Sequence, residues 1–149
     1  MKVISNSFHD KSDIPVRYTC DGEDISPHLQ WEKVGKGLYA VIMEDPDAPG
    51  GTFYHWAIYN VTTTELPEAI PKMTSTQYGD QAINDFGRVG YGGPCPPRGP
   101  PHRYFVKVYA LKERMMLPAR IGVREVATVA ESIAVDVGEI MGKYRRGGK

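Results

Sequence analysis

The stretch that decides the fold is Tyr91-Gly92-Gly93-Pro94-Cys95-Pro96-Pro97-Arg98-Gly99-Pro100-Pro101-His102-Arg103-Tyr104. It holds five prolines and three glycines in fourteen residues, and it runs directly into a strand pattern over residues 104–111. Proline fixes φ and removes an amide donor, so this backbone is stiff, whereas glycine lets other groups approach closely. Loops held by a rigid scaffold often carry function. The loop is either purely structural or a support that holds His102 and Tyr104 still at the start of a strand.

Strand patterns precede this loop in the sequence. Residues 38–43 form a continuous apolar run between Gly37 and the Asp45-Pro46 break, which predicts a strand buried on both faces. Residues 55–61 predict the next strand. Residues 1–20 are interpreted as extended, because the segment 14–20 alternates and carries β-branched residues. Residues 62–80 are polar and contain prolines, so we interpret them as a loop.

The C-terminal part shows a different periodicity. From Gly122, apolar residues recur at steps of three and four, which is typical of an amphipathic helix packed on a sheet. The residues in this pattern are Val123, Val126, Ala127, Ala130, Ile133, Ala134, Val137, Ile140 and Met141. Because the sequence shows no linker and no internal repeat, we expect one mainly β domain over residues 1–149, ending in a C-terminal amphipathic helix.

Composition excludes several classes of function. The chain has 18 Lys plus Arg and 18 Asp plus Glu, so no basic surface points to nucleic acid. No apolar run approaches the ~20 residues that cross a bilayer, so stable membrane insertion is not expected. The first ten residues lack the apolar core of a secretory signal, and we therefore expect a cytoplasmic location.

The two cysteines leave an alternative open. Cys20 and Cys95 are too few for a disulfide framework, and their spacing is not that of a zinc site. Two reduced thiols are the simplest interpretation. A single bridge between them would close a long loop, and the sequence does not decide between these states.

Acidic and histidine side chains fall at the ends of the predicted strands. Asp45 ends one strand, His55 begins the next, and His102 begins the strand after the stiff loop. If these strands are neighbours, their ends converge on one rim. Gly92 and Gly93 would add free backbone amides. A concave group of backbone amides and histidine donors, called a nest, suits binding of phosphate or carboxylate. Each residue also has a structural interpretation on its own, such as Asp45 capping its turn.

Motifs for common enzyme classes are missing. No serine lies in a Gly-x-Ser-x-Gly elbow. Gly142-Lys143-Tyr144 lacks the hydroxyl residue of a phosphate-binding loop. Two histidines and one aspartate could form a facial metal triad, but no His-x-x-x-His spacing supports it. We therefore expect no catalytic residue, no metal and no cofactor.

Three sequence blocks resemble the phosphatidylethanolamine-binding protein (PEBP) family, which includes the Raf kinase inhibitor proteins. The blocks are Asp45-Pro46-Asp47-Ala48-Pro49, His55-Trp56, and Gly93-Pro94-Cys95-Pro96-Pro97-Arg98-Gly99 with His102-Arg103-Tyr104. The segments 21–27 and 84–87, and the final helix running into residues 142–144, are similar to the bacterial and archaeal branch. The resemblance implies a central antiparallel sheet with a second, smaller sheet.

The resemblance also implies an anion pocket at the rim for phosphate-type headgroups. Its ligand-binding residues would be Asp45, His55, Pro96, Pro97, His102 and Tyr104, and its shape would depend on Asp47, Pro49, Tyr91, Gly92 and Gly93. Eukaryotic members have a longer insert with an aromatic residue between the positions of Pro49 and His55, and some have a further C-terminal extension. The shorter chain here predicts a wider, more open site.

Family members inhibit kinases or serine-type proteases, so the resemblance favours a non-enzymatic inhibitor of a partner enzyme, with a chymotrypsin-like serine protease preferred over a kinase. The candidate inhibitory loop contains Met115, Met116 and Leu117, which alternatively cap the core because methionine commonly fills gaps. A small-molecule hydrolase, or a carrier of phospholipid or phosphate ligands using the same pocket, is the competing function. Short β domains with exposed apolar loops often dimerise, so a homodimer is a candidate assembly.

Overall fold

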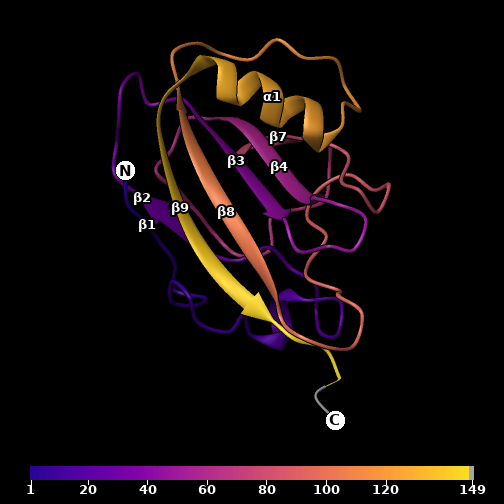
Figure 1. The fold of residues 1–149 in the computed structure, drawn as a ribbon. Helices are drawn as coiled ribbons and strands as arrows, with labels where there is room; N and C mark the ends of the chain where they lie inside the picture. Colours follow the sequence, from indigo (N-terminus) through magenta and orange to yellow (C-terminus); the bar gives the residue numbers. More distant parts are fainter. Residues whose placement is uncertain (148–149) are drawn as a thin grey trace.

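The computed structural model describes residues 1–147, and two antiparallel sheets make up most of it (Figure 1). The large sheet has the strand order β6-β7-β4-β3-β8-β9, and the small sheet has the order β1-β2-β5. The elements are β1 (Val3–Ile4), the 3₁₀ turn η1 (Val16–Tyr18), β2 (Leu29–Trp31), β3 (Tyr39–Asp45), β4 (Phe53–Val61), β5 (Glu65–Leu66), β6 (Ser75–Thr76), β7 (Gly79–Gln81), β8 (His102–Leu111), α1 (Val123–Ile133) and β9 (Ala134–Tyr144). The mainly β fold with two sheets is confirmed.

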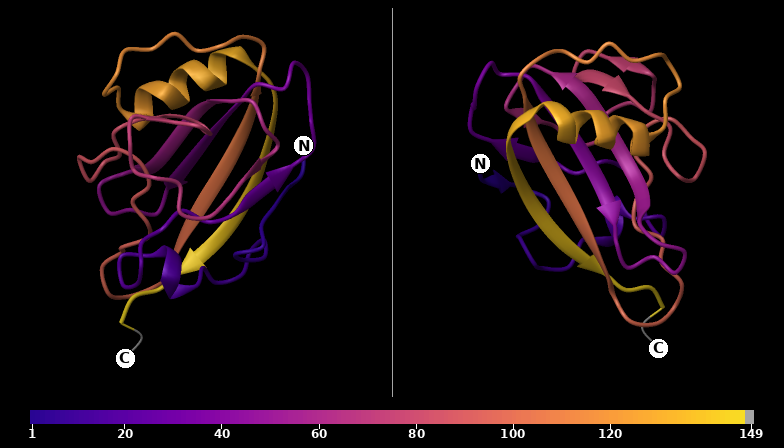
Figure 2. Two further views of the ribbon diagram at one scale, coloured as in Figure 1. Left: turned by 180° about the vertical axis from the view of Figure 1, so that it is seen from behind. Right: turned by 45° about the horizontal axis from the view of Figure 1, so that its top comes forward.

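The central strand β3 is buried on both faces, as its continuous apolar run predicted. Tyr39, Val41 and Met43 pack in the layer shared with the small sheet. Ala40 and Ile42 pack in the layer shared with α1, which crosses over the large sheet (Figure 2). Full burial of each aliphatic side chain contributes roughly 1.5–3 kcal/mol. These two layers make the large sheet a rigid support for the loops at its ends.

The predicted C-terminal helix is right only for its first half. Helix α1 ends at Ile133, and the chain continues as the edge strand β9, paired along its length with β8. The segment around Ile140 fits both helical and alternating patterns, so period alone did not decide. Gly138 and Gly142 argue against a helix here, since each glycine in a helix interior costs about 1 kcal/mol of stability relative to alanine.

The two glycines of β9 have a packing role. A Cβ at Gly138 would lie 2.3 Å from the Met1 carbonyl oxygen, and one at Gly142 would lie 2.4 Å from the Ile14 side chain. The N-terminal segment thus runs directly over this strand. The Lys11 amide donates to the Met141 carbonyl at 2.6 Å, which covers part of the sheet edge.

Two other segments differ from the sequence prediction. Residues 14–20 are not a strand: Pro15 is the N-cap of the single turn η1, and its carbonyl accepts from the Tyr18 amide at 3.1 Å. Residues 62–80, predicted as a loop, contain the short strands β5 and β6 and the start of β7. Within residues 1–147, no helix combines the length and apolar character needed to span a bilayer.

Candidate functional site

The end of β3 and the beginnings of β4 and β8 meet at one rim of the large sheet. Asp45 at the end of β3 pairs with Phe53 at the start of β4, and Glu44 pairs with Phe105 near the start of β8. Because both pairings are antiparallel, the polar residues at these strand ends are brought together. They line a cavity of about 110 Å³.

Seven of the predicted ligand-binding and shaping residues line this cavity: Asp45, Pro49, His55, Pro96, Pro97, His102 and Tyr104. Four further lining residues were not predicted as site residues: Ala48, Phe53, Phe86 and Cys95. The rings of Phe53 and Phe86 stand in the wall with their centroids 4.7 Å apart, so aromatic side chains border the cavity; the wider site predicted from the short segment before His55 stays a prediction.

Asp45 and His102 form the polar centre of the cavity. The carboxylate is 3% exposed and accepts from His102 Nδ1 at 2.7 Å and from the Asp47 amide at 2.7 Å. Both oxygens are therefore engaged, and the imidazole ring is fixed in orientation. His102 Nε2 has no partner within residues 1–147, so it is available to a ligand. When both ring nitrogens carry a proton, Nε2 donates a hydrogen bond.

His55 offers the opposite chemistry. Its Nδ1 donates to the Gly92 carbonyl at 2.6 Å, and the side chain is almost fully buried. This burial lowers the pKa of His55 below its usual value, against the weaker opposing effect of the Gly92 carbonyl. The ring is thus neutral near pH 7, with Nε2 as a hydrogen-bond acceptor.

The hydroxyl of Tyr104 lacks a hydrogen-bond partner. Tyr104 is 0% exposed and lines the cavity, and its oxygen is one of two buried side-chain polar atoms in residues 1–147 without a partner, the other being Trp31 Nε1. Burial raises the pKa of Tyr104 far above its usual range, with Asp45 acting in the same direction, so the group is a neutral donor. An unsatisfied buried hydroxyl costs about 1–3 kcal/mol, which a ligand acceptor would recover.

Gly92 and Gly93 do not provide the free backbone amides predicted for the pocket. The Gly92 amide donates to the His55 carbonyl at 3.1 Å, and the Gly93 amide donates to Asp24 Oδ1 at 2.8 Å. Tyr91 is a core residue whose hydroxyl donates to the Tyr18 carbonyl at 2.6 Å. These three residues shape the pocket indirectly, through packing.

The two glycines are required for close approach. A Cβ at Gly92 would lie 2.5 Å from the Phe86 ring, so a side chain there would displace one wall of the cavity. A Cβ at Gly93 would lie 2.2 Å from the Tyr18 carbonyl oxygen. Gly93 therefore allows residues 18–24 to pack against the pocket loop.

Asp47 braces the turn beside the cavity. It accepts two side-chain hydrogen bonds from Arg103, at 2.9 and 2.8 Å, and one from the Arg103 amide at 2.9 Å. The Arg103 side-chain hydrogen bonds lower the pKa of Asp47 to about 2. The contact joins the β3–β4 turn to the start of β8, which is a shaping role.

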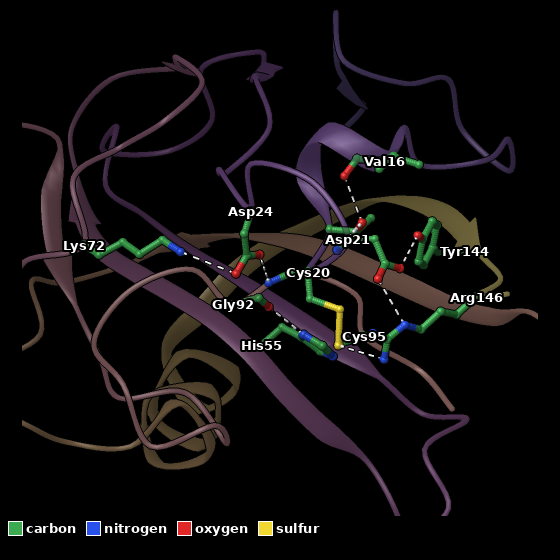
Figure 3. Close-up of a disulfide and its surroundings, with 12 residues drawn as sticks. Val16, Cys20, Asp21, Asp24, His55, Lys72, Gly92, Cys95, Tyr144 and Arg146 are labelled. Atoms are coloured by element: carbon green, nitrogen blue, oxygen red, sulfur yellow. Dashed lines mark hydrogen bonds and ion pairs between the residues drawn. A yellow bond between two sulfur atoms is a disulfide. The ribbon is translucent and has the colours of Figure 1, made fainter. Parts of the chain in front are cut away.

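Cys20 and Cys95 are joined in a disulfide across 75 residues, so of the two states that the sequence left open the structure has the single bridge (Figure 3). Two cysteines far apart in sequence gave no spacing signal. The structural reason for the bridge lies at Gly93, whose missing side chain allows residues 18–24, and with them Cys20, to pack against the loop that carries Cys95. Arg146 Nη1 lies 3.6 Å from Cys95 Sγ, and Asp21 binds Tyr144 and Arg146 at the end of the chain's last strand (Figure 3).

The candidate inhibitory loop is only partly exposed. Met115 is 3% exposed, and its amide and carbonyl both bond to the Asn60 side chain at 2.9 Å. It belongs to the core layer under α1, which confirms the alternative interpretation for this residue. Met116 is 86% exposed, and Leu117 is half-buried.

Metal ligation is not supported by the side-chain arrangement. Within residues 1–147, no group of three or more His, Cys, Asp or Glu side chains is placed to hold a metal ion. At the cavity itself, one imidazole is bonded to a carboxylate and the other to a carbonyl. The cavity instead presents the Tyr104 hydroxyl as a donor, His55 Nε2 as an acceptor, and the Nε2 of His102 without a partner among the described residues.

Comparisons with known proteins agree on one family. Residues 4–145 match the family model described as phosphatidylethanolamine-binding protein. A UPF0098 protein of Aquifex aeolicus is 49% identical, with 98% of this chain and 89% of that protein covered. A UPF0098 protein of Pyrococcus horikoshii is 41% identical, with 96% and 76% covered. The crystal structure of Escherichia coli YbcL, described as a new member of the mammalian PEBP family, matches with a TM-score of 0.89 at 31% identity over 98% of both chains.

Proposed function

Because the chain belongs to the phosphatidylethanolamine-binding protein family, we propose that it is a non-enzymatic binding protein whose rim cavity holds a phosphate-type anion. The observation that carries the proposal is the buried, unpartnered hydroxyl of Tyr104 in a cavity that His102 also lines. A buried donor without an acceptor is rarely retained for stability, since it costs free energy. An anion oxygen supplies the missing acceptor.

The ligand chemistry can be narrowed from the three polar groups. Tyr104 and the imidazolium form of His102 donate, whereas neutral His55 accepts. An oxyanion that itself carries a proton, such as hydrogen phosphate or a phosphate monoester, satisfies all three groups. The cavity of about 110 Å³ holds a headgroup of this size, while acyl chains would remain outside it.

The test is a pair of tyrosine variants with opposite expected behaviour. Tyr104→Phe removes a donor that has no protein partner, so we expect phosphate affinity to fall about tenfold while stability is unchanged or rises. Tyr91→Phe removes a hydroxyl bonded to the Tyr18 carbonyl, so we expect lower stability and unchanged affinity. Calorimetric titration with inorganic phosphate and urea unfolding measure both. Unchanged phosphate affinity in Tyr104→Phe, or no binding by the unmodified protein, rejects the proposal.

Inhibition of a partner enzyme is the physiological role we propose for this binding protein, with a chymotrypsin-like serine protease favoured over a kinase. The supporting observation is Met116, which projects into solvent from a loop whose neighbour Met115 is anchored in the core. An anchored loop with an exposed apolar side chain fits a large apolar specificity pocket. We expect Met116→Asp to abolish inhibition of chymotrypsin, and Met73→Asp, at another exposed methionine, to leave it intact. Inhibition that survives Met116→Asp rejects this loop.

A small-molecule hydrolase is the competing proposal, favoured by one observation. The hydrogen bond between Asp45 and His102 orients an imidazole as in general-base catalysis. It requires turnover of phosphate or carboxylate esters that is lost in His102→Gln. Phosphate binding without turnover of such esters rejects it. A carrier of phospholipid is distinguished from both by transfer of the lipid between vesicles.

Assembly and location also remain proposals. A homodimer is tested by light scattering of the purified protein. The cytoplasmic location predicted from the sequence requires the disulfide to persist there, and disulfides are rare in reducing cytosols outside hyperthermophiles. Alkylation of thiols in intact cells, followed by mass spectrometry of Cys20 and Cys95, shows whether the bridge exists in the cell.

A further inference from the structure

The backbone hydrogen bonding of the loop that forms one wall of the cavity stops at Cys95. Before it, the loop is fixed by the Gly92 and Gly93 amides and by the Cys20 amide, which donates to the Pro94 carbonyl at 3.1 Å. From residue 95 to residue 101, no backbone hydrogen bond is formed within the described part of the chain. Four of these seven residues are prolines without an amide donor. The wall segment, defined as residues 95–97, therefore has no backbone hydrogen bond to hold it, and its one side-chain hydrogen bond is the 3.6 Å contact from Arg146 Nη1 to Cys95 Sγ.

The disulfide supplies that support. It joins Cys95, at the start of the wall segment, to Cys20 on the opposite loop. That loop has independent anchors: the Tyr18 carbonyl accepts from Tyr91, and Asp21 accepts from Tyr144 at 2.6 Å (Figure 3). If the bridge opened, the Cys20 side would stay in place and the wall segment would gain freedom.

We propose that the Cys20–Cys95 disulfide positions the wall segment, so that the anion affinity of the cavity depends on its oxidation state. This inference rests on the proposed anion binding. With the bridge closed, Pro96 and Pro97 are held as a preorganised wall of the cavity that Tyr104 and His102 also line. With the bridge open, only a fraction of molecules has the wall in place, and the apparent affinity falls by that fraction.

The redox step balances with a dithiol as reductant. A thiolate of the dithiol attacks one sulfur of the bridge, and the S–S bond breaks to release one protein thiol and form a mixed disulfide. The second thiol of the reductant then attacks its own sulfur partner in the mixed disulfide and releases the other protein thiol. Two electrons and two protons pass to Cys20 and Cys95, and the dithiol becomes a cyclic disulfide. Both cysteines are half-buried and Cys95 lines the open cavity, so a small reductant reaches the bridge.

Coupling of this kind acts in both directions. If the oxidised form binds phosphate about tenfold more tightly than the reduced form, saturating phosphate lowers the reduction potential of the bridge by about 30 mV. The anion therefore protects the disulfide, and the disulfide preserves the anion site.

The experiment measures phosphate affinity by calorimetry for the oxidised protein, for protein reduced with dithiothreitol, and for the double variant Cys20→Ser with Cys95→Ser. We expect about tenfold weaker binding in the last two, with no effect of dithiothreitol on the double variant. Equal affinity of oxidised and reduced protein overturns the inference but leaves the proposed function standing. No binding even by the oxidised protein overturns both.

A second measurement needs no variant and does not depend on whether the double variant folds. The bridge is titrated with mixtures of reduced and oxidised dithiothreitol, with and without saturating phosphate, and free thiols are counted by alkylation. We expect the midpoint to become more negative by about 30 mV in phosphate. Sulfate at matched ionic strength separates specific binding from a general salt effect. An unchanged midpoint in phosphate rejects the coupling.

Discussion

Two histidine–carboxylate pairs occupy different regions of the molecule, and their surroundings give them different roles. His28 at the small sheet lies 2.6 Å from Glu65 through Nε2, and its Nδ1 accepts from the Asn6 amide at 2.9 Å. His102 at the rim lies 2.7 Å from Asp45 through Nδ1, and its Nε2 faces no partner among residues 1–147. His28 has both nitrogens engaged within the protein, whereas His102 has one left for a ligand.

The difference shows that a histidine–carboxylate contact alone does not identify a site. The additional features are an unsatisfied ring nitrogen, a cavity beside it, and other unsatisfied polar groups nearby. Tyr104 provides the last of these at the rim. Near His28, a surface depression is also present, but neither nitrogen of the ring is available to it.

The largest effect is expected when the rim pair is altered. His102→Gln keeps a donor to Asp45 but cannot carry charge, and losing one charged hydrogen bond to phosphate costs about 2 to 3 kcal/mol, or roughly 30- to 150-fold in affinity. Calorimetric titration with inorganic phosphate measures the change. His28→Gln is the matched control and should bind as the unmodified protein does. Equal losses in the two variants would remove the distinction between the pairs.

The next effect concerns stability at the other pair. His28→Ala leaves the Asn6 amide and the Glu65 carboxylate without a partner, so we expect the free energy of unfolding to fall by about 2 kcal/mol. Urea unfolding followed by circular dichroism checks this, with Tyr91→Phe as a reference for one lost buried hydrogen bond. If stability is unchanged, the His28 contacts are not structural.

A third histidine, His55, sharpens the comparison through pH. Because burial holds the pKa of His55 below its unfolded value of 6.5, the unfolded chain binds the proton more readily. His55 therefore contributes stability above about pH 6.5 that is lost as pH falls through its lower folded pKa. We expect the urea midpoint to drop between pH 7 and pH 5, and to drop less in His55→Gln. A parallel drop in both proteins would assign the pH dependence to other groups.

The smallest effect is expected at the solvent-exposed pair beside the rim. Since Arg103 lowers the pKa of Asp47 to about 2, this contact stabilises the fold above about pH 4 and is lost as pH falls through 2. Asp47→Asn should therefore differ slightly from the unmodified protein at pH 7 and converge with it near pH 2. Salt should reduce the difference, because the pair is accessible to ions. The measurement is the thermal midpoint across this pH range.

The sequence was most informative where local pattern and tertiary environment agree. The strand β3 was predicted correctly because a strand buried on both faces is a continuous apolar run. The polar residues at the strand ends were identified because they follow or precede such apolar runs directly. Phe86 was missed as a pocket residue, since its position against Gly92 depends on a loop contact rather than a pattern. The strand β9 was missed because Val137, Ile140 and Met141 continue the three- and four-residue steps of the helix, although only Ile140 of these three is buried in the strand. The disulfide required the three-dimensional approach of two loops.

The pairing of β3 with β8 has a consequence for the time course of folding. Tyr39 pairs with Ala110, so forming the centre of the large sheet closes a loop of about seventy residues. Contacts this distant along the chain fold slowly, because the entropy of loop closure is lost before the contacts stabilise anything. During synthesis, Asp45 and His55 therefore emerge long before His102 can reach them. The rim cavity is therefore among the last features that a newly made chain acquires.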